Sequence, residues 1–393
     1  MTMQDRFPQA LLSEPKEVRL AYFRSKIVAH PRLKEVHQTL MNAIRQPTGV
    51  LLILVLGPTG VGKTTLRLGI EKQLREELSP ELEQDLGRVP VVGVEAVASE
   101  SGTFNWKDYY SRVLLALDEP LLRYKIDYGT RGLRRNGTGQ LVVGHDVAAV
   151  QLRRTLELSL CNRRPAAVIV DEAQHLKKVS GSRRMLDQMD TLKSLASTSG
   201  IVHVLVGTYE LLGLANLSAQ LSRRSIEIHF PRYRVNRREE AMAFKRVLLT
   251  FQRHLPLPEE PDLVSRYEYF YEHCVGCVGI LKKWLDTSLA FALDEGHEHL
   301  TSADLERHAE PTRKLLRMAW ELKEGEEAMQ DRGDGRMELR TLLGLEPQTS
   351  NSDWTDEAKP RTPDATGRKR AAGRVGQRRP VRDPVGEGQD EQG

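Results

Sequence analysis

Five short apolar runs, rich in β-branched residues, occur along the chain between residues 51 and 230. Segments with helical apolar spacing separate these runs, which is the pattern of parallel strands joined by helical crossovers. The sequence therefore predicts an α/β fold with a parallel five-stranded sheet in a three-layer core. The expected strands are Leu51–Leu56, Val89–Val97, Ala166–Val170, Ile201–Val206 and Ser225–Phe230.

The pattern changes on both sides of this core. Arg32–Ile44 has helical apolar spacing, and from Val235 onward amphipathic helices such as Gly279–Ala292 replace the β runs. Beyond Pro347 few apolar residues remain, and such a composition does not offset the entropy cost of ordering. The expected domains are an N-terminal helical segment (1–48), an α/β core (49–234), a helical lid (235–324), a C-terminal helical extension (325–346) and a disordered basic tail (347–393).

Composition narrows the class of protein. The chain has 393 residues, of which 39% are hydrophobic, enough for two or three compact units. It has no apolar run of membrane-spanning length and no apolar signal core at its start, and its 3 cysteines are too few for a disulfide framework. These features predict a cytoplasmic location with no membrane partner. The net charge of +4 neither demands nor excludes nucleic acid.

The segment Gly57–Thr65 reads Gly-Pro-Thr-Gly-Val-Gly-Lys-Thr-Thr and lies between the first expected strand and a helical pattern. It fits the phosphate-binding motif G-x-x-x-x-G-K-[ST]. In this motif the glycines let backbone N–H groups turn toward phosphate oxygens, Lys63 meets the β- and γ-phosphates, and Thr64 coordinates Mg²⁺. The predicted ligand is a nucleotide, held by Gly57, Pro58, Thr59, Gly60, Val61, Gly62, Lys63, Thr64 and Thr65.

A second motif, Ala166–Glu172, is a buried-strand pattern that ends in two carboxylates. Alone, this acidic pair also fits an ordinary strand exit, but together with the first motif it fits a Walker B sequence. Asp171 would then hold the Mg²⁺ shell with Thr64, and Glu172 would orient or polarise the attacking water. The two motifs together predict an ATPase that uses ATP and Mg²⁺.

The organisation of residues of about 30 to 320 resembles that of AAA+ ATPases, with a P-loop, a Walker B motif, a polar residue after the fourth strand, an arginine pair and a small helical domain. Within that superfamily, the chain resembles the transposon regulators called TniB or TnsC. This resemblance implies an ATPase that binds double-stranded DNA with ATP, assembles with itself into rings or helical filaments, and connects target selection to a transposase through an adaptor of the TniQ type. The segments that carry it are Phe104–Tyr110, Leu114–Asp118, Asp171–Leu176, Leu221–Arg224 and Phe230–Tyr233.

The resemblance implies roles for further residues. Thr208 matches the polar sensor of the γ-phosphate, and a turn or helix-capping threonine is the alternative. Arg224 matches the arginine finger that reaches the neighbouring subunit, with Arg223 as its competitor and a solvated basic turn as the alternative. Lys282 matches the second sensor of the lid, where AAA+ proteins usually carry an arginine, and a surface lysine is the alternative.

The expected DNA contacts depend on weaker patterns, because sequence-independent binders need only Lys, Arg and backbone donors facing phosphates. The long separation between the two motifs leaves room for residues 101–107 and for a loop at 128–138, both of which could face a central pore. In the resembling family this region contacts DNA. The implied phosphate-binding residues are Thr103, Lys107, Arg131, Arg134 and Arg135, whereas we expect Trp106 to pack in the core.

Two other features leave alternatives open. The basic segment Arg368–Arg382 is typical of a phosphate-binding arm or a partner-docking segment, but acidic flanks make a purely solvating tail equally compatible. Cys274 and Cys277 form a CxxC pair without a second pair of ligands, which favours structural cysteines over a zinc site.

The sequence thus leads to one main hypothesis, an ATP-dependent DNA-binding regulator of transposition in which hydrolysis drives disassembly. A replication-initiator or helicase-loader type ATPase would share the same core and differ in its client. A nucleotide-gated switch of the STAND type would bind nucleotide without DNA.

Overall fold

The computed structural model describes residues 6–98, 104–117, 133–135, 141–143, 149–177, 182–215, 225–329 and 333–345. The chain divides into two compact units, Met1–Asp331 and Arg332–Gly393. In the second unit the described part consists of the helix α15 (Gly333–Leu342) and the three residues that follow it. The predicted tail, 347–393, lies outside the described residues.

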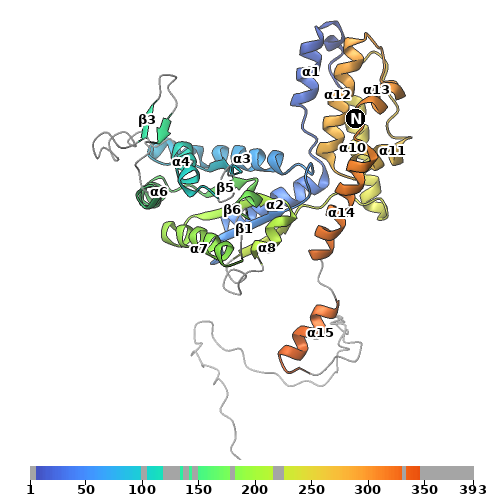
Figure 1. The fold of residues 1–393 in the computed structure, drawn as a ribbon. Helices are drawn as coiled ribbons and strands as arrows, with labels where there is room; N and C mark the ends of the chain where they lie inside the picture. The colour runs from blue at the N-terminus through green and yellow to red at the C-terminus, as the bar shows by residue number, and fades with distance from the viewer. Residues whose placement is uncertain are drawn as a thin grey trace, which may run out of the picture. The chain divides into compact units, whose positions relative to one another are not determined.

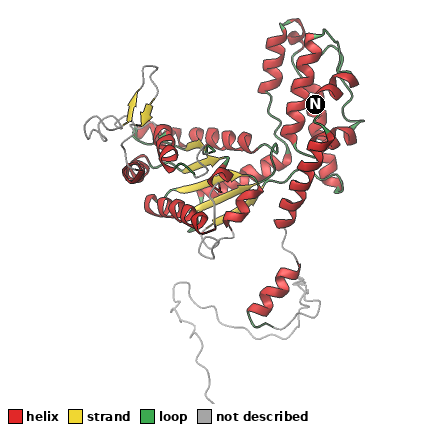
Figure 2. Ribbon diagram, in the orientation of Figure 1, coloured by secondary structure: helices red, strands yellow, loops and turns green. Residues whose placement is uncertain are grey.

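The core sheet has five parallel strands in the order β2-β5-β6-β1-β7 (Figures 1 and 2). The predicted fold class and all five predicted strands are confirmed, since each strand lies within its predicted run or extends past it by one residue. β1 is paired with β6 on one side and β7 on the other, so its end lies in the interior of the sheet edge. The strands are β1 (Leu52–Leu56), β2 (Val92–Glu95), β5 (Ala167–Asp171), β6 (Val202–Gly207) and β7 (Ser225–His229).

A second, two-stranded antiparallel sheet lies within the segment that the sequence predicts to be a loop. It consists of β3 (Leu133–Arg135) and β4 (Leu141–Val143). The loop prediction is therefore wrong for residues 133–135. Strands this short carry too little apolar periodicity to be recognised before their partner is known.

Side chains of the core strands alternate between two faces, which produces three layers. In β1, Leu54 belongs to the hydrophobic cluster formed with α4, α6 and α7, whereas Ile53 and Val55 belong to the cluster formed with α2 and α3. The helices around the sheet are α2 (Pro31–Arg45), α3 (Lys63–Gln84), α4 (Trp106–Ala116), α6 (Ala149–Arg163), η3 (Ala173–Lys177), α7 (Ser182–Ser199), η4 (Tyr209–Leu211) and α8 (Leu212–Ala215).

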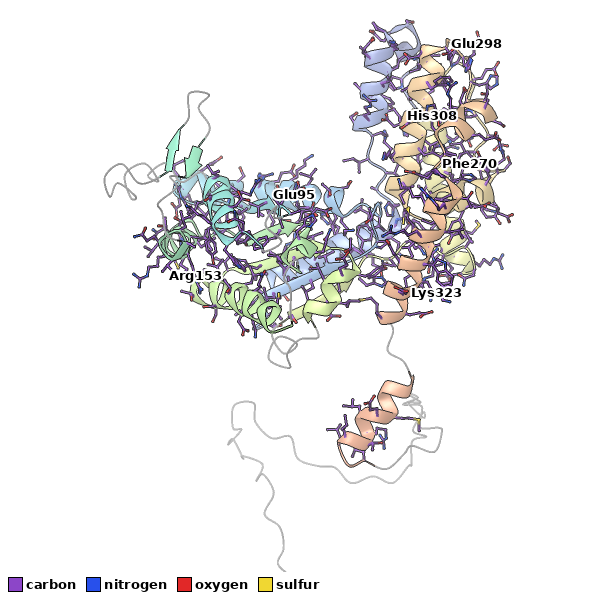
Figure 3. The ribbon with its side chains drawn as sticks, viewed as in Figure 1. Glu95, Arg153, Phe270, Glu298, His308 and Lys323 are labelled. Carbon is purple, nitrogen blue, oxygen red and sulfur yellow. The ribbon has the colours of Figure 1, made fainter. Side chains whose placement is uncertain are left out.

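The helical lid has a hydrophobic cluster of its own, in which Phe270 is fully buried (Figure 3). Phe23 of the N-terminal region joins this cluster, while Leu40 joins the core cluster. The predicted N-terminal helical segment is therefore divided between the lid and the core. The elements that form this part are η2 (Gln9–Ser13), α1 (Lys16–Ser25), α10 (Arg238–His254), α11 (Tyr267–Cys274), α12 (Val278–Asp294) and α13 (Ser302–His308).

The last helix of the first unit, α14 (Thr312–Ala328), runs through the boundary predicted at residue 324. Two of its residues contact the core region. Gly325 lies against the ring of Tyr209, and the buried Glu326 accepts a hydrogen bond from Arg232 Nε (2.9 Å) and pairs with Arg234 (3.1 Å). These contacts explain why residues 325–328 belong with the lid rather than with the following extension.

His30 connects the lid side to the core side and caps α2. Its Nδ1 accepts a hydrogen bond from Leu33 N (3.3 Å) and lies 3.0 Å from Tyr233 Oη. Burial lowers the pKa of His30 to about 4. The neutral ring is therefore the form that the folded protein uses, because a proton on Nδ1 would remove the acceptor of the cap.

This arrangement predicts a pH-dependent stability. The pKa of His30 in the unfolded chain is about 6.5, so its contribution is complete above that value and is lost as the pH falls toward 4, with a maximum of about 3 kcal/mol. Thermal unfolding from pH 7.5 to 4.5 should show this loss, and the cap-preserving variant His30→Asn should lose less stability over the same range. Equal pH slopes in both proteins would contradict the prediction. The buried His203, whose pKa burial also lowers to about 4, stays unchanged in the variant and contributes equally to both curves.

Candidate nucleotide site

The P-loop connects the end of β1 to the start of α3. Gly60 and Gly62 have φ values of 78° and 112°, a left-handed region that favours glycine. A Cβ atom on Gly57 would clash with the carbonyl oxygen of Phe230. The loop therefore has this shape only with glycine at these positions, and it begins the helix at Lys63 as predicted from the sequence.

Lys63 is buried, with 6% of its surface exposed. Its Nζ donates hydrogen bonds to the loop's own carbonyl oxygens, Gly57 O (3.0 Å) and Pro58 O (2.8 Å). Burial lowers the pKa of Lys63, and the nearby carboxylates of Glu172 and Asp171 oppose this effect. The ammonium group thus lies at the loop where phosphate oxygens would replace its carbonyl partners.

Thr64 and Asp171 are brought together although 107 positions separate them in the sequence. Thr64 Oγ1 donates a hydrogen bond to Asp171 Oδ2 (3.0 Å), while Asp171 Oδ1 accepts one from Glu172 N (2.9 Å). A hydroxyl and a carboxylate oxygen are ligands suited to Mg²⁺, which usually retains water and binds through one or two protein groups plus phosphate. The donor set therefore fits the metal that the sequence predicts.

Glu172 follows β5 and has a φ of 52°, which is unusual for a residue other than glycine. Its Oε2 accepts a hydrogen bond from Gln174 Nε2, and Gln174 Oε1 accepts one from Thr208 N (3.2 Å). Thr208 Oγ1 is buried and makes no hydrogen bond within the described part of the chain. Gln174 thus links the two residues that the sequence assigns to water activation and to sensing. The motif contained it, but nothing local assigned it this role.

The lid reaches the P-loop through backbone atoms. Gly279 N donates a hydrogen bond to Gly60 O (2.7 Å), and Ile280 lies beside the same glycine. This contact places the start of α12 directly over the loop. The sequence analysis expected α12 to face the nucleotide but did not identify Gly279.

Lys282 does not face the loop, so its predicted sensor role is corrected. Two positions after Ile280, it lies on a different side of the helix. Its Nζ donates hydrogen bonds to the carbonyl oxygens of Phe23 and Lys26 (3.0 Å for Lys26) and lies 3.9 Å from the Phe23 ring centroid. Burial lowers its pKa to about 8. Lys282 therefore fastens α1 to the lid.

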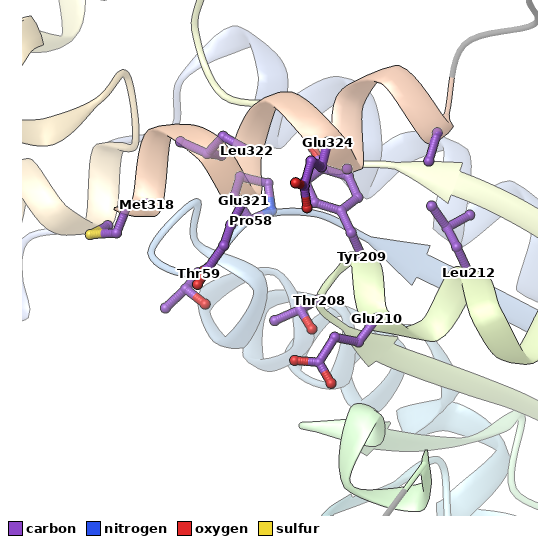
Figure 4. Close-up of a pocket in the computed structure, with 12 residues that line it drawn as sticks. Pro58, Thr59, Thr208, Tyr209, Glu210, Leu212, Met318, Glu321, Leu322 and Glu324 are labelled. Atoms are coloured by element: carbon purple, nitrogen blue, oxygen red, sulfur yellow. The ribbon is translucent and has the colours of Figure 1, made fainter. Parts of the chain in front are cut away.

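A cavity of about 380 Å³ lies between the P-loop and α14 (Figure 4). Thr59 and Thr208 line it from the core, and Met318, Leu322 and Glu324 line it from α14. The cavity therefore adjoins the loop on the side of the predicted sensor. The remaining loop positions pack as a support for the site, because Val61 is 2% exposed and belongs to the core cluster with α2 and α3.

The structure places only some of the other predicted residues. Arg223 and Arg224, together with Thr103 and Arg131, lie outside the described residues. The backbone of Arg134 and Arg135 belongs to β3, and Lys107 lies in the first turn of α4. The adjacent Trp106 packs against the core cluster, as predicted. Cys274 and Cys277 are both buried free thiols of the lid region.

Comparison with known proteins agrees with this geometry. Residues 47–215, which include both phosphate motifs and Thr208, match the family model described as an AAA domain. No curated protein matches the chain significantly. The chain therefore contains an AAA+ P-loop core with a five-stranded parallel sheet.

Several solved structures are similar in fold. The Aeropyrum pernix ORC1 protein in complex with DNA has 18% identity and a TM-score of 0.49, with 75% of this chain and 70% of that chain covered. The ADP form of the ORC2 protein of Aeropyrum pernix has 17% identity and a TM-score of 0.48, with 73% and 71% covered. CDC6P from Pyrobaculum aerophilum has 13% identity and a TM-score of 0.45, with 73% and 69% covered. Within the described residues, every helix is too short or too polar to cross a lipid bilayer.

Proposed function

We propose that this chain is a Mg²⁺-dependent ATPase that assembles on double-stranded DNA and regulates transposition. The observation that carries the ATPase part is the convergence of Lys63, Thr64, Asp171 and Glu172 at one edge of the sheet, with Thr64 Oγ1 3.0 Å from Asp171 Oδ2. The DNA and transposase parts are supported by the resemblance of the sequence to the TniB and TnsC regulators.

The residues of the site have separate tasks in this proposal. The P-loop N–H groups and Lys63 bind the phosphates, and Thr64 and Asp171 hold the metal, which neutralises charge on the transferred phosphoryl group when it is bound. Glu172 orients the attacking water. Gln174 keeps the carboxylate of Glu172 in register with Thr208, so that hydrolysis and sensing depend on one hydrogen-bonded connection.

Assembly would complete the site. A guanidinium from Arg224 of the neighbouring subunit would stabilise the charge of the transition state, an effect worth about 10³ to 10⁵ in rate for such residues. ATP would then stabilise the oligomer on DNA, and hydrolysis would release it. Thr103, Lys107, Arg131, Arg134 and Arg135 are the proposed contacts to the DNA backbone.

Negative-stain imaging with duplex DNA provides the test of this function. We expect ordered rings or filaments with ATP and with a non-hydrolysable analogue, and none with ADP, because only a triphosphate reaches the neighbouring subunit. A Lys63→Ala variant is the control, and it should form no assemblies in any nucleotide. A wild-type protein that stays monomeric with saturating ATP and DNA would contradict the proposal.

The client of the ATPase requires a second measurement. Co-purification of a transposase or of a TniQ-type adaptor with the DNA-bound assembly is expected. Co-purification of a replicative helicase instead would favour the replication-initiator hypothesis. Nucleotide binding with no DNA-stimulated turnover would favour a STAND-type switch.

A further inference from the structure

A second cation lies at the carboxylate of Asp171. Arg67, on α3 one turn after Lys63, has its Nε 3.6 Å from Asp171 Oδ2 and 3.6 Å from Glu71 Oε1. The side chain of Arg67 is 17% exposed, and that of Asp171 is 4% exposed. The guanidinium is therefore largely shielded from water at the edge of the proposed metal site.

The carboxylate oxygen that Arg67 approaches is the one that faces Thr64. Asp171 Oδ1 is already engaged by Glu172 N (2.9 Å), whereas Oδ2 accepts from Thr64 Oγ1 (3.0 Å). Arg67 Nε itself is buried and makes no hydrogen bond within the described part of the chain. The arginine thus acts on Asp171 through charge rather than through a hydrogen bond from this atom.

Glu71 holds Arg67 in this position. It is 6% exposed, it packs tightly against Gly93 of β2, and it accepts a hydrogen bond from Arg75 Nη2 (3.0 Å). Because Glu71 is confined between α3 and the sheet, Arg67 has a fixed anionic partner on one side and Asp171 on the other. A buried carboxylate of this kind requires a nearby cation.

We propose that Arg67 is a positioning residue that occupies the metal-facing oxygen of Asp171 until a triphosphate arrives, so that Mg²⁺ binds this chain only together with nucleotide. This inference depends on the proposed Mg²⁺–ATP site. It adds the order of binding and a residue outside both sequence motifs.

The physical basis is the repulsion between a guanidinium and a divalent ion that share one carboxylate. Removing the charge of Arg67 should strengthen metal binding at least about tenfold, because like charges only a few ångströms apart interact strongly even at an effective dielectric constant of about 20. A purely structural role predicts the opposite sign. Loss of the arginine would then loosen Asp171 and weaken metal binding.

The test compares the full-length wild-type protein with Arg67→Gln, Arg67→Lys and Arg75→Gln. Binding of a fluorescent ATP analogue is measured over a series of Mg²⁺ concentrations, and binding of Mn²⁺ without nucleotide is measured by electron paramagnetic resonance. Arg75 is the matched control, because it contacts Glu71 but is half exposed and makes no printed contact with Asp171 in the described structure. Thermal melting checks that each variant folds, and Arg67→Met provides a second uncharged variant.

We expect Arg67→Gln to lower the Mg²⁺ concentration for half-maximal nucleotide binding at least about tenfold and to bind Mn²⁺ without nucleotide. Arg67→Lys and Arg75→Gln should behave like the wild type. An unchanged or weakened metal dependence in both uncharged variants would overturn the inference alone. Failure of the wild type to bind nucleotide at any Mg²⁺ concentration would instead overturn the proposed function.

Discussion

Replacing Glu172 with glutamine should slow ATP hydrolysis by about 10² to 10⁴-fold, the usual contribution of a positioned general base. ATP affinity should stay unchanged, because Lys63, Thr64 and Asp171 hold the phosphates and the metal. The neutral amide keeps the size of Glu172 and can still contact Gln174, so the change removes the charge that orients water. Single-turnover hydrolysis and equilibrium binding, measured on the same protein, separate the two effects.

A matched control is available in Glu210, a carboxylate that lines the cavity beside Thr208 but is exposed. Glu210→Gln should hydrolyse ATP at the wild-type rate. If the proposed timer role is correct, Glu172→Gln should also prolong the lifetime of DNA-bound assemblies. Wild-type turnover by Glu172→Gln would show that another group activates the water.

Replacing Gly279 with valine is expected to weaken ATP binding by about tenfold or more, because overpacking of this kind typically costs 1–3 kcal/mol. A Cβ atom at this position would lie 2.6 Å from Gly60 O, and this neighbour is backbone that has no alternative rotamer. The start of α12 would have to move, and the hydrogen bond from Gly279 N to Gly60 O (2.7 Å) would be lost. The lid would then no longer close over the P-loop.

Equilibrium titration with a fluorescent ATP analogue measures this effect. Thr287→Val is the control on the same helix, since Thr287 is exposed and its hydroxyl donates only to Lys283 O (2.9 Å). Unaltered nucleotide affinity in Gly279→Val, with the protein folded, would mean that the lid contact does not contribute to binding.

Much of the nucleotide site was predictable because its parts are continuous in the chain. The loop around Lys63 has a fixed spacing of glycines, and Asp171 and Glu172 directly follow an apolar run. Once these segments are strands of one parallel sheet, their carboxyl ends meet at the same edge. The prediction of Thr64 next to Asp171 followed from that rule, and the 3.0 Å contact agrees with it.

Other contacts had no local signal. Lys282 matched a family position, yet its ammonium group binds carbonyl oxygens of α1, a helix more than 250 positions earlier. Arg67 was an unremarked polar position of α3 until β5 placed Asp171 beside it. The short strand at Leu133–Arg135 likewise depends on a partner that local periodicity does not reveal.

The amino-acid order was therefore sufficient for the strands, the phosphate loop and the acidic pair, because backbone periodicity and glycine spacing act over a few residues. Long-range packing settled the strand order, the orientation of Lys282, the neighbourhood of Arg67 and the seat of α14 against Tyr209. Each of these joins segments that are distant in the chain, and their energies depend on which surfaces meet rather than on the residues beside them.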